Sequence, residues 1–577
     1  RGDNISENFI ADAKEARLLE GEIFVPLAFT AEALGWNPKT DENGGIRVSI
    51  GGESRTFSET APTVGERYID NVMCAPLRRL AELAGLGYYT DGDLGIASKA
   101  VDAGVEVPQK VTERFRQLLG YNWRNVYMGA EGYVDEIAVH PKNPDLMYVA
   151  TDVGGVYKWR AETKAWIPIT DSLNFVKDDG LQTVLSLALD PNDENVIYYV
   201  AGNALGAKNG IMKSENQGAS WTLLDFPARI CDVDSSRLAG PWIQVDPNDS
   251  NTVYCGSYDS GLFVSHNAGR TWESCNGVGV SPESCPGGTV SILVDGRERM
   301  PDGKSKVVYA GTWGQGVYKS DDGGASFKLM KDSPVQPARM QLADGVLYAS
   351  SQDVMGNEKE YSGGLFKCEN DEWKNISPDV EPAKPGDAYN AFVVDPAKPG
   401  TIICFGPTWH SNTTQTYRSL DGGETWSYLG KTTSGAQCMA DPKNPKAFYM
   451  IWGFGIYYFP DMYAERLEPT SIDVGIEELC CLCFLSNPSS KAPGLLANVM
   501  DRGTKVSERV DSLAKTLLPQ VGKGSGLNFC EGDPSFVVRT GYETDSVYGT
   551  SSVSVSTDYG RTMRNVAWNN EYGILDS

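Results

Sequence analysis

Five near-identical segments decide the fold: SENQGASW (residues 214–221), SHNAGRTW (265–272), SDDGGASF (320–327), SLDGGETW (419–426) and STDYGRTM (556–563). Each reads Ser-x-Asp/Asn-x-Gly-x-Ser/Thr and ends in an aromatic residue, except that Met563 ends the last copy. In this box turn, as we call it, we expect the Asp or Asn side chain to hydrogen-bond the backbone two residues on, the Gly to take a positive φ, and the ring to anchor the turn in a core. Such repetition predicts a repeat architecture.

A second repeat alternates with the box turns. Each copy leads from an apolar residue through a Pro-centred turn into a run of strand-forming residues: VHPKNPDLMYVAT (139–151), LDPNDENVIYYVAG (189–202), VDPNDSNTVYCGS (245–257), VDPAKPGTIICFGP (394–407) and ADPKNPKAFYMIWG (440–453). The spacing is about fifty residues, the size of one four-stranded propeller blade. We therefore expect about nine units after residue 125, each reading strand, Pro turn, strand, Gly-rich turn, strand, box turn and strand.

The composition predicts a globular, mainly all-β protein with an acidic surface. Hydrophobic residues make up 41% of the 577 residues, 62 are Gly, and the formal charge is −25. This charge would be repelled by nucleic-acid phosphates and by anionic membranes, so neither is an expected partner. No apolar run reaches the roughly 18 residues of a membrane span, so we expect no membrane insertion.

The cysteines and histidines predict no metal and no cofactor. Among the twelve Cys, Cys275 and Cys285 flank one loop and are a candidate disulfide. Cys480, Cys481 and Cys483 lie on a predicted strand, where a metal site is the alternative to buried free thiols. The three His stand alone and no paired Cys-x-x-Cys motif occurs, which favours free thiols.

Residues 1–105 form a different, α+β module with an internal repeat. EIFVPLAFTAEALGW (22–36) and NVMCAPLRRLAELAGLGYY (71–89) each read strand, Pro, short helix, Gly and aromatic, and strands IRVSI and LGIAS follow them. This pattern resembles the stalk module called the copper amine oxidase N-terminal-like domain, which implies a spacer or surface-attachment role. No His precedes His140, so the segment lacks the ligands of a copper site. Residues 106–121 are the expected helical linker.

The region from residue 122 resembles glycoside hydrolase family 74, the xyloglucanase family. The resemblance rests on TDVGGVY (151–157) with Trp159, Trp166 and Asp171, and on GIEELCCLCFLS (475–486), LLANVMDRG (495–503) and VSVSTDYGRT (553–562). It implies two seven-bladed propellers that face each other across a cleft. In this chain we expect one complete propeller at 122–434 and part of a second at 435–577. Because the chain ends just after a box turn, where a blade still needs its last strand, we expect the natural chain to be longer.

The resemblance implies inverting hydrolysis of a β-glucan by two acidic residues, roughly 6.5–9.5 Å apart. The first falls on Asp152, followed by Gly154 and Gly155, although an Asp before Gly-Gly is also a common turn former. The position of the second is Gln437, five residues before Pro442. An amide cannot do acid–base chemistry, so Gln437 is a candidate substrate-binding residue instead. Asp501 is a weak replacement candidate.

Overlaying the repeats puts mostly aromatic residues in the slot of Asp152. In later units the slot falls on Tyr258 or Asp259, Trp313, Asp353, Trp409 and Trp452. Equivalent loops of a propeller emerge on one face, so these rings are candidates to stack on sugar faces. The alternative is that the Trp side chains pack between blades.

These features predict a secreted or cell-surface glycan-interacting protein of a Gram-positive-type bacterium, with a polysaccharide partner such as xyloglucan. Whether it is an enzyme, a glycoside hydrolase, stays open, because the alternative is a non-catalytic surface, adhesion or scaffold protein with a cell-wall or surface-layer partner. A sialidase is a third option. It needs an arginine triad, and the arginines are scattered along the chain.

Overall fold

The computed structural model describes two units, residues 1–125 and 126–577. In the first unit it describes the backbone of nine strands. In the second it describes these residues: 128–129, 132–171, 173, 180–202, 208–230, 235–284, 286–352, 363–407, 413–433, 435–452, 455–477, 479, 481–499, 503–509, 514–516, 523–542 and 551–566.

The described strands of the first unit form three sheets. The four-stranded sheet has the order β1 (Arg17–Leu19), β2 (Glu22–Pro26), β7 (Val72–Pro76), β6 (Arg67–Ile69). The others are β3 (Lys39–Thr40), β4 (Ile46–Ile50), β5 (Glu53–Phe57) and β8 (Gly87–Asp91), β9 (Leu94–Ser98). The two repeated segments thus pair through antiparallel β2 and β7. The predicted helices after Pro26 and Pro76 and the linker 106–121 lie outside the described residues, and the stalk-type module stays a prediction.

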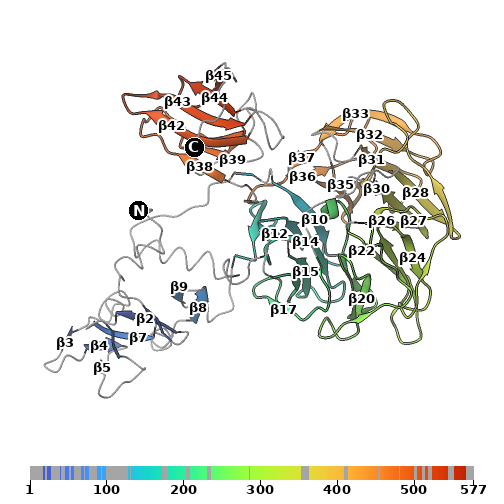
Figure 1. The fold of residues 1–577 in the computed structure, drawn as a ribbon, viewed down its shortest axis with the longest axis horizontal. Coiled ribbons are helices and arrows are strands. Elements are labelled where there is room, and N and C mark those ends of the chain that lie inside the picture. Colours follow the sequence, from blue (N-terminus) through green and yellow to red (C-terminus); the bar gives the residue numbers. More distant parts are fainter. Residues whose placement is uncertain are drawn as a thin grey trace. The chain divides into compact units, whose positions relative to one another are not determined.

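The second unit contains nine four-stranded antiparallel sheets among its described residues, each in chain order, as the repeats predict. The first seven lie around a ring (Figure 1). Their first strands contact one another in succession, and β10 also contacts β34 and β35, so the ring closes. The first strands are therefore the innermost ones: β10 (Val134–Val139), β14 (Val184–Leu189), β18 (Ile243–Asp246), β22 (Thr289–Arg299), β26 (Pro337–Ala343), β30 (Ala391–Val394) and β34 (Gln437–Asp441).

The remaining strands of each blade follow outward. The second strands are β11 (Met147–Thr151), β15 (Ile197–Ala201), β19 (Asp249–Gly256), β23 (Ser305–Thr312), β27 (Val346–Ser351), β31 (Ile402–Gly406) and β35 (Asn444–Trp452). The third are β12 (Gly155–Arg160), β16 (Gly210–Ser214), β20 (Leu262–Ser265), β24 (Gly316–Ser320), β28 (Gly364–Glu369), β32 (Thr413–Ser419) and β36 (Gly455–Phe459). The fourth are β13 (Ala165–Pro168), β17 (Thr222–Leu224), β21 (Glu273–Ser274), β25 (Lys328–Leu329), β29 (Glu372–Asn375), β33 (Ser427–Thr433) and β37 (Thr470–Ser471).

The predicted division between residues 434 and 435 differs from the structure. The sheet that begins at β34 packs on the first sheet of the ring, where Ile451 and Ile456 share a core with Val134 and Val149. The indole N–H of Trp166 also donates to the carbonyl oxygen of Ile472 at 2.6 Å. This sheet is therefore the last blade of the ring, and the next group of sheets begins only at Cys481. The repeats alone predict the blades. Which blade closes the ring depends on which first strand, other than that of the neighbouring blade, packs against β10, and this strand is β34.

The last two sheets form a separate group. They are β38 (Cys481–Leu485), β39 (Leu495–Val499), β40 (Gly503–Ser507), β41 (Lys515–Thr516), and β42 (Lys523–Cys530), β43 (Asp533–Tyr542), β44 (Ser551–Ser556), β45 (Arg564–Val566). Leu496 of the first and Val537 of the second share a small core.

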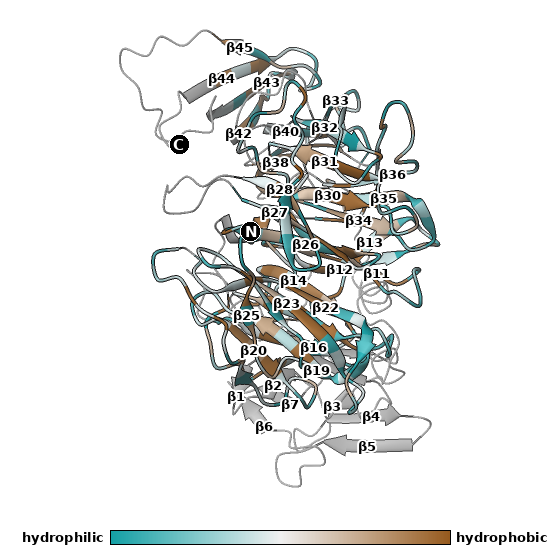
Figure 2. Cartoon of the chain, turned by 90° about the vertical axis from the view of Figure 1, so that its right-hand side faces the viewer, coloured by the Kyte–Doolittle hydropathy of each residue, from teal (hydrophilic) through white to brown (hydrophobic). Residues whose placement is uncertain are grey.

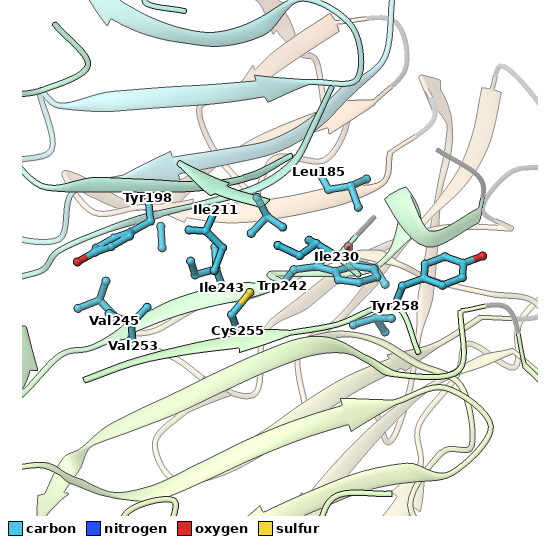
Figure 3. Close-up of a cluster of buried hydrophobic side chains, with 14 of the residues drawn as sticks. Leu185, Tyr198, Ile211, Ile230, Trp242, Ile243, Val245, Val253, Cys255 and Tyr258 are labelled. Atoms are coloured by element: carbon cyan, nitrogen blue, oxygen red, sulfur yellow. Dashed lines mark hydrogen bonds between the residues drawn. The ribbon is translucent and has the colours of Figure 1, made fainter. Parts of the chain in front are cut away.

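The core of the ring lies between adjacent blades. Most ring strands are apolar and most connecting turns polar in Figure 2. The largest cluster collects residues from the sheets that begin at β14, β18, β22 and β26 (Figure 3). Its fully buried members include Tyr198, Ile211, Trp242 and Val253. Burying these side chains against the neighbouring blade is the main stabilising contribution expected for the ring.

The box turns form at the predicted residues, but the Asp or Asn side chain bonds the backbone four residues on and not two residues on as predicted. The reason is that the Ser hydroxyl accepts from the N–H of the Asp or Asn itself and from that of the Gly two residues further on. In the turn at Ser214, the hydroxyl oxygen accepts from the Gly218 N–H at 2.8 Å, and the Asn216 amide oxygen accepts from the Ser220 N–H at 2.9 Å. Gly218 has a φ of 88°. The turns that begin at Ser265, Ser320, Ser419 and Ser556 repeat both bonds.

Within the described residues, no helix is long and apolar enough to cross a membrane, and no group of three or more His, Cys, Asp or Glu side chains is arranged to hold a metal ion. Cys275 is a free thiol, while Cys285 and Cys480 lie outside the described residues.

Candidate functional site

The candidate site lies at the end of the blades opposite the box turns. Since the strands of each sheet run antiparallel, the starts of the first strands and the ends of the second strands share this end. We call it the mouth of the ring. Asp152 follows β11 directly and therefore lies at the mouth.

The loop that carries Asp152 is held rigidly. The Thr151 hydroxyl donates to the carbonyl oxygen of Gly155 at 3.1 Å and accepts from the Gly154 N–H at 3.0 Å. The Asp152 N–H donates to the carbonyl oxygen of Tyr133 at 3.1 Å. Gly155 has a φ of 79°, and a Cβ there would lie 2.0 Å from the Thr170 hydroxyl oxygen. Only glycine fits this position, which fixes where the Asp152 carboxylate points.

Arg237 forms an ion pair with Asp152 at the mouth. Its guanidinium comes from η1, a 3-10 helix (Ser235–Leu238), and the two side chains are 20% and 14% exposed. The same guanidinium lies over the ring of Tyr133, 4.4 Å from the ring centroid. The aromatic face and the carboxylate together hold Arg237 beside Asp152.

The segment 237–240 crosses the mouth and joins several blades. The side-chain amide of Asn390 donates to the carbonyl oxygen of Leu238 at 3.4 Å, and Leu238 also packs against Ala436 and Tyr133. The Gly240 N–H donates to the carbonyl oxygen of Ala338 at 2.9 Å. This segment, which we call the strap, therefore contacts blades that are far apart in the sequence and brings Arg237 to Asp152.

Asp135 is a second carboxyl group beside Asp152. It occupies a β-bulge at the start of β10 and is fully buried. Burial is the main cause that raises the pKa of Asp135 well above its usual range, and the neighbouring Asp152 carboxylate raises it further. Arg237 and Arg339 act in the opposite direction.

Buried polar side chains surround Asp135 and the strap. Nη2 of Arg339 donates to the main-chain carbonyl oxygen of Asp135 at 3.1 Å. The Asn390 amide donates to Oε1 of Gln352 at 2.6 Å, and the main-chain N–H of Gln352 donates to the carbonyl oxygen of Gln336 at 3.0 Å. A polar cluster at the centre of the mouth is costly to bury, which is typical of a functional site.

Gln437 holds two blades together. Its Oε1 accepts from the Ile137 N–H at 3.0 Å and so joins the last inner strand of the ring to the first. Gln244 and Gln341 accept from Val294 and Val394 on the next inner strand in the same way, at 3.1 and 3.2 Å. The carboxylate of Glu136 accepts from the Leu187 N–H at 3.3 Å. Sequence reasoning treated Gln437 as a site residue, whereas its side chain serves a recurring inter-blade clamp.

The aromatic residues at the mouth are less accessible than predicted. Trp313 has no exposed surface, and its indole N–H donates to the carbonyl oxygen of Pro337 at 2.9 Å. Tyr258 is 5% exposed, and the Arg229 guanidinium covers its ring at 4.3 Å. Figure 3 shows Tyr258 at one end of the buried cluster. A buried ring offers no face to a sugar, so the predicted exposed stacking is wrong for Trp313 and for the covered ring of Tyr258.

The other predicted site residues are not described in this structure. Trp452 ends β35, but its side chain lies outside the described residues, as do Trp409 and Asp501. Their predicted roles stay predictions.

Sequence reasoning missed Arg237 and Asp135. Arg237 carries no sequence signal, because 85 residues separate it from Asp152. Asp135 does carry a sequence signal. An overlay of the repeats places this acidic residue where other blades have the apolar Leu185 and Val290.

Comparison with known proteins identifies the relatives of the chain. A xyloglucanase of a Paenibacillus species is 28% identical over 517 residues, which cover 76% of this chain and 49% of the relative. A xyloglucanase of Acetivibrio thermocellus is 26% identical over 519 residues, which cover 76% of this chain and 60% of the relative. No protein-family model matches.

The solved structures agree with this result. The glycoside hydrolase family 74 xyloglucanase of Xanthomonas campestris superimposes with a TM-score of 0.70 at 24% identity, over 78% of this chain and 70% of that one. The family 74 enzyme of Niastella koreensis gives 0.65 at 27% identity, over 78% and 68%. The homologues and structural neighbours are family 74 xyloglucanases.

This result confirms the predicted family resemblance and the mainly β propeller architecture. The chain spans about half the length of the family 74 relatives named first, 49% and 60%.

Proposed function

We propose that this chain is a family 74-like propeller protein that binds a β-glucan such as xyloglucan at the mouth around Asp152. The observation that carries the proposal is the 28% identity over 517 residues to a xyloglucanase. The mouth supports it, because the glycine-containing loop fixes a partly exposed carboxylate among buried polar groups. Carboxylates and arginines of this kind suit hydrogen bonding to sugar hydroxyl groups.

Inverting hydrolysis is the second candidate, favoured by the retained Asp152 in its TDVGGVY segment. The reaction needs one carboxylic acid and one carboxylate on either side of the sugar bond. Gln437 supplies neither, and its oxygen holds Ile137. We therefore place binding before hydrolysis. Secretion, and a cell-wall or surface-layer partner, stay predictions that cell fractionation would test.

The test uses the full chain and two readouts. Isothermal titration with xyloglucan oligosaccharides measures binding, and release of reducing ends from xyloglucan measures hydrolysis. Asp152→Asn should weaken binding roughly tenfold or more, because it removes a charged hydrogen-bond acceptor and the partner of Arg237. Asp259→Asn is the matched control, since Asp259 is an exposed carboxylate in the corresponding loop of the third blade.

Each outcome decides between the candidates. Binding without product release selects the binding protein. Product release that Asp152→Asn abolishes and Asp259→Asn retains selects the hydrolase. Absence of both binding and release in the wild type would contradict the proposed function.

A further inference from the structure

Asp135 occupies a position that other blades fill with an apolar side chain. The bulges at the starts of β10, β14 and β22 are equivalent, because each lies opposite the end of the second strand of its sheet. The residue in the bulge is Asp135 in the first blade, Leu185 in the second and Val290 in the fourth. Leu185 and Val290 are buried and belong to the core. A carboxyl group in this position breaks the local packing rule, which proteins tolerate chiefly at functional sites.

The carboxyl group of Asp135 has no hydrogen-bond partner within the described part of the chain. Both of its oxygens are buried without one. Arg339 is close, but it donates to the main-chain oxygen of Asp135, and its Nε and Nη1 are likewise buried without a partner among the described residues. A structural carboxylate would be expected to use these donors. Asp135 is therefore poorly explained as a stabilising residue.

Arg237 lies at the segment that carries both carboxyl groups of the mouth. It forms the ion pair with Asp152, and its guanidinium lies over the ring of Tyr133, two residues before Asp135 in the chain. Burial raises the pKa of Asp135, and the charge of Arg237 lowers it. Two carboxyl groups beside one guanidinium compete for it when both are charged, and a proton on one of them removes the competition. Asp152 is the partly exposed member of the pair, and Asp135 is the buried one.

We propose that Asp135 is a positioning residue of the Asp152 site that acts through Arg237: it leaves the guanidinium on Asp152 while it holds a proton, and it competes for that guanidinium once the proton is lost. The proposal rests on the proposed glycan-binding function, because Asp152 is the group that a sugar hydroxyl would reach. Loss of the proton from Asp135 draws Arg237 inward and leaves the Asp152 carboxylate available to the ligand.

The charged and titratable groups around Asp135 come from four elements. Asp152 lies on the loop after β11, Arg237 on η1, Arg339 on β26, and Glu136 on β10 itself. The phenol of Tyr133, directly before β10, is a fifth titratable group beside Asp135. Asp152 and Glu136 favour the protonated form of Asp135, whereas the two arginines favour the charged form. Variants of Asp152 and Arg237 should therefore shift the titration of Asp135 in opposite directions.

Infrared difference spectroscopy on the full chain tests the first half of the proposal. The carbonyl band of protonated carboxylic acids in the wild type should contain a component that Asp135→Asn removes, while the components of the buried Glu136 and Glu477 remain in both proteins. The titration midpoint of the Asp135 component should rise by about one pH unit in Arg237→Met and fall by about one unit in Asp152→Asn. Asp259→Asn should leave the titration midpoint unchanged. Absence of the Asp135 component, or a midpoint that neither variant moves, would overturn the proposal whether or not the protein binds glycan.

Isothermal titration with xyloglucan oligosaccharides across pH tests the second half. Wild-type binding should tighten about tenfold as the pH rises through the infrared midpoint, since one unit of pKa corresponds to a factor of ten. Asp135→Asn should change less than twofold over the same range. Equal pH profiles for the two proteins would overturn the positioning role. Absence of binding at every pH would instead contradict the proposed function and leave the infrared result to decide the link between Asp135 and Arg237.

A second variant protects the test against misfolding. Asp135→Val introduces the residue type that the fourth blade carries at this bulge, and it should raise the melting temperature at pH 7 while losing the pH dependence of binding. A lowered melting temperature in both Asp135→Val and Asp135→Asn would show a structural role and overturn the proposal.

Discussion

At one end of the ring, each box turn closes through hydrogen bonds between residues four positions apart, as between Ser214 and Gly218. At the mouth, by contrast, the bonds join residues 85, 152 and 204 positions apart, as between Arg237 and Asp152. The turn end repeats the same bonds in every box turn, whereas the side chain that the mouth loops present differs between blades, as between Asp152 and Tyr258. Since the local turns and the inter-blade cores already hold the ring, the mouth is free to carry side chains that cost stability.

The slot of Asp152 shows this difference within one loop type. Ser257 and Thr151 make the same hydroxyl bonds to the glycine four residues on, so Tyr258 and Asp152 are structurally equivalent. The same slot holds an ion-paired carboxylate in the first blade and a covered ring in the third. The loop scaffold repeats, and the residue it presents decides whether the position serves the core or the ligand.

The largest expected effect on stability is that of replacing Trp313. It tests whether the residue in the slot of Asp152 is part of the hydrophobic core in this blade. Trp313→Ala should lower the free energy of unfolding by about 3–5 kcal/mol, because a fully buried ring and its bond to Pro337 are lost. Chemical denaturation measures the change. Leu420→Ala is the control, since Leu420 is 62% exposed and should change stability little. A loss of glycan affinity with unchanged stability would instead restore the predicted stacking role.

Glu136 tests how much an ionised side chain in an inter-blade clamp lowers the free energy of unfolding. Burial raises the pKa of Glu136 to about 7, although Arg339 lowers it. Its contribution to stability is therefore complete below about pH 4.5 and is lost as the pH rises through about 7. Glu136→Gln keeps a side-chain oxygen that can accept from the Leu187 N–H, as Gln437 does for Ile137, and it cannot ionise. The loss of stability with rising pH is therefore removed. The variant should be more stable than the wild type above pH 7 by up to about 3 kcal/mol.

Unfolding measured from pH 4.5 to 8 checks the Glu136 prediction. The difference between variant and wild type should shrink toward zero at pH 4.5, where both side chains are uncharged. A difference that does not depend on pH would show that Glu136 does not titrate in the folded ring in this range.

Gln437 distinguishes the clamp from a lost acid. Gln437→Ala leaves the buried N–H of Ile137 without its acceptor and should cost about 1–3 kcal/mol in a denaturation experiment. Gln244→Ala is the matched variant, because it removes the corresponding bond to Val294, and it should behave alike. If Gln437→Ala were neutral while Gln244→Ala destabilised the ring, the clamp role of Gln437 would be refuted.

The smallest effect is expected at a single box turn. Ser419→Ala removes the acceptor of the Gly423 N–H and should cost about 1 kcal/mol. Thr425→Val, which removes an exposed hydroxyl bond to Asp421, should cost less. Thermal unfolding of both variants measures the difference. Equal losses would mean that the buried and exposed bonds of the turn contribute alike.

Much of the framework follows from local patterns. The positions of the box turns and the strand order of each blade are confirmed, because each depends on residues within one repeat. The pairing of the ring's last blade with its first was not predictable from these patterns. It depends on contacts such as those of Trp166 with Ile472, which are 306 positions apart.

The sequence by itself determined a β-rich repeat protein, the spacing of its blades, and Asp152 on a glycine-fixed loop, since short-range hydrogen bonding and steric limits dictate these features. Only the tertiary structure decided that Gln437 is a clamp, that Trp313 is buried and that Asp135 and Arg237 stand beside Asp152. The physical reason is that burial and charge depend on what the closed ring brings together, which no single repeat encodes.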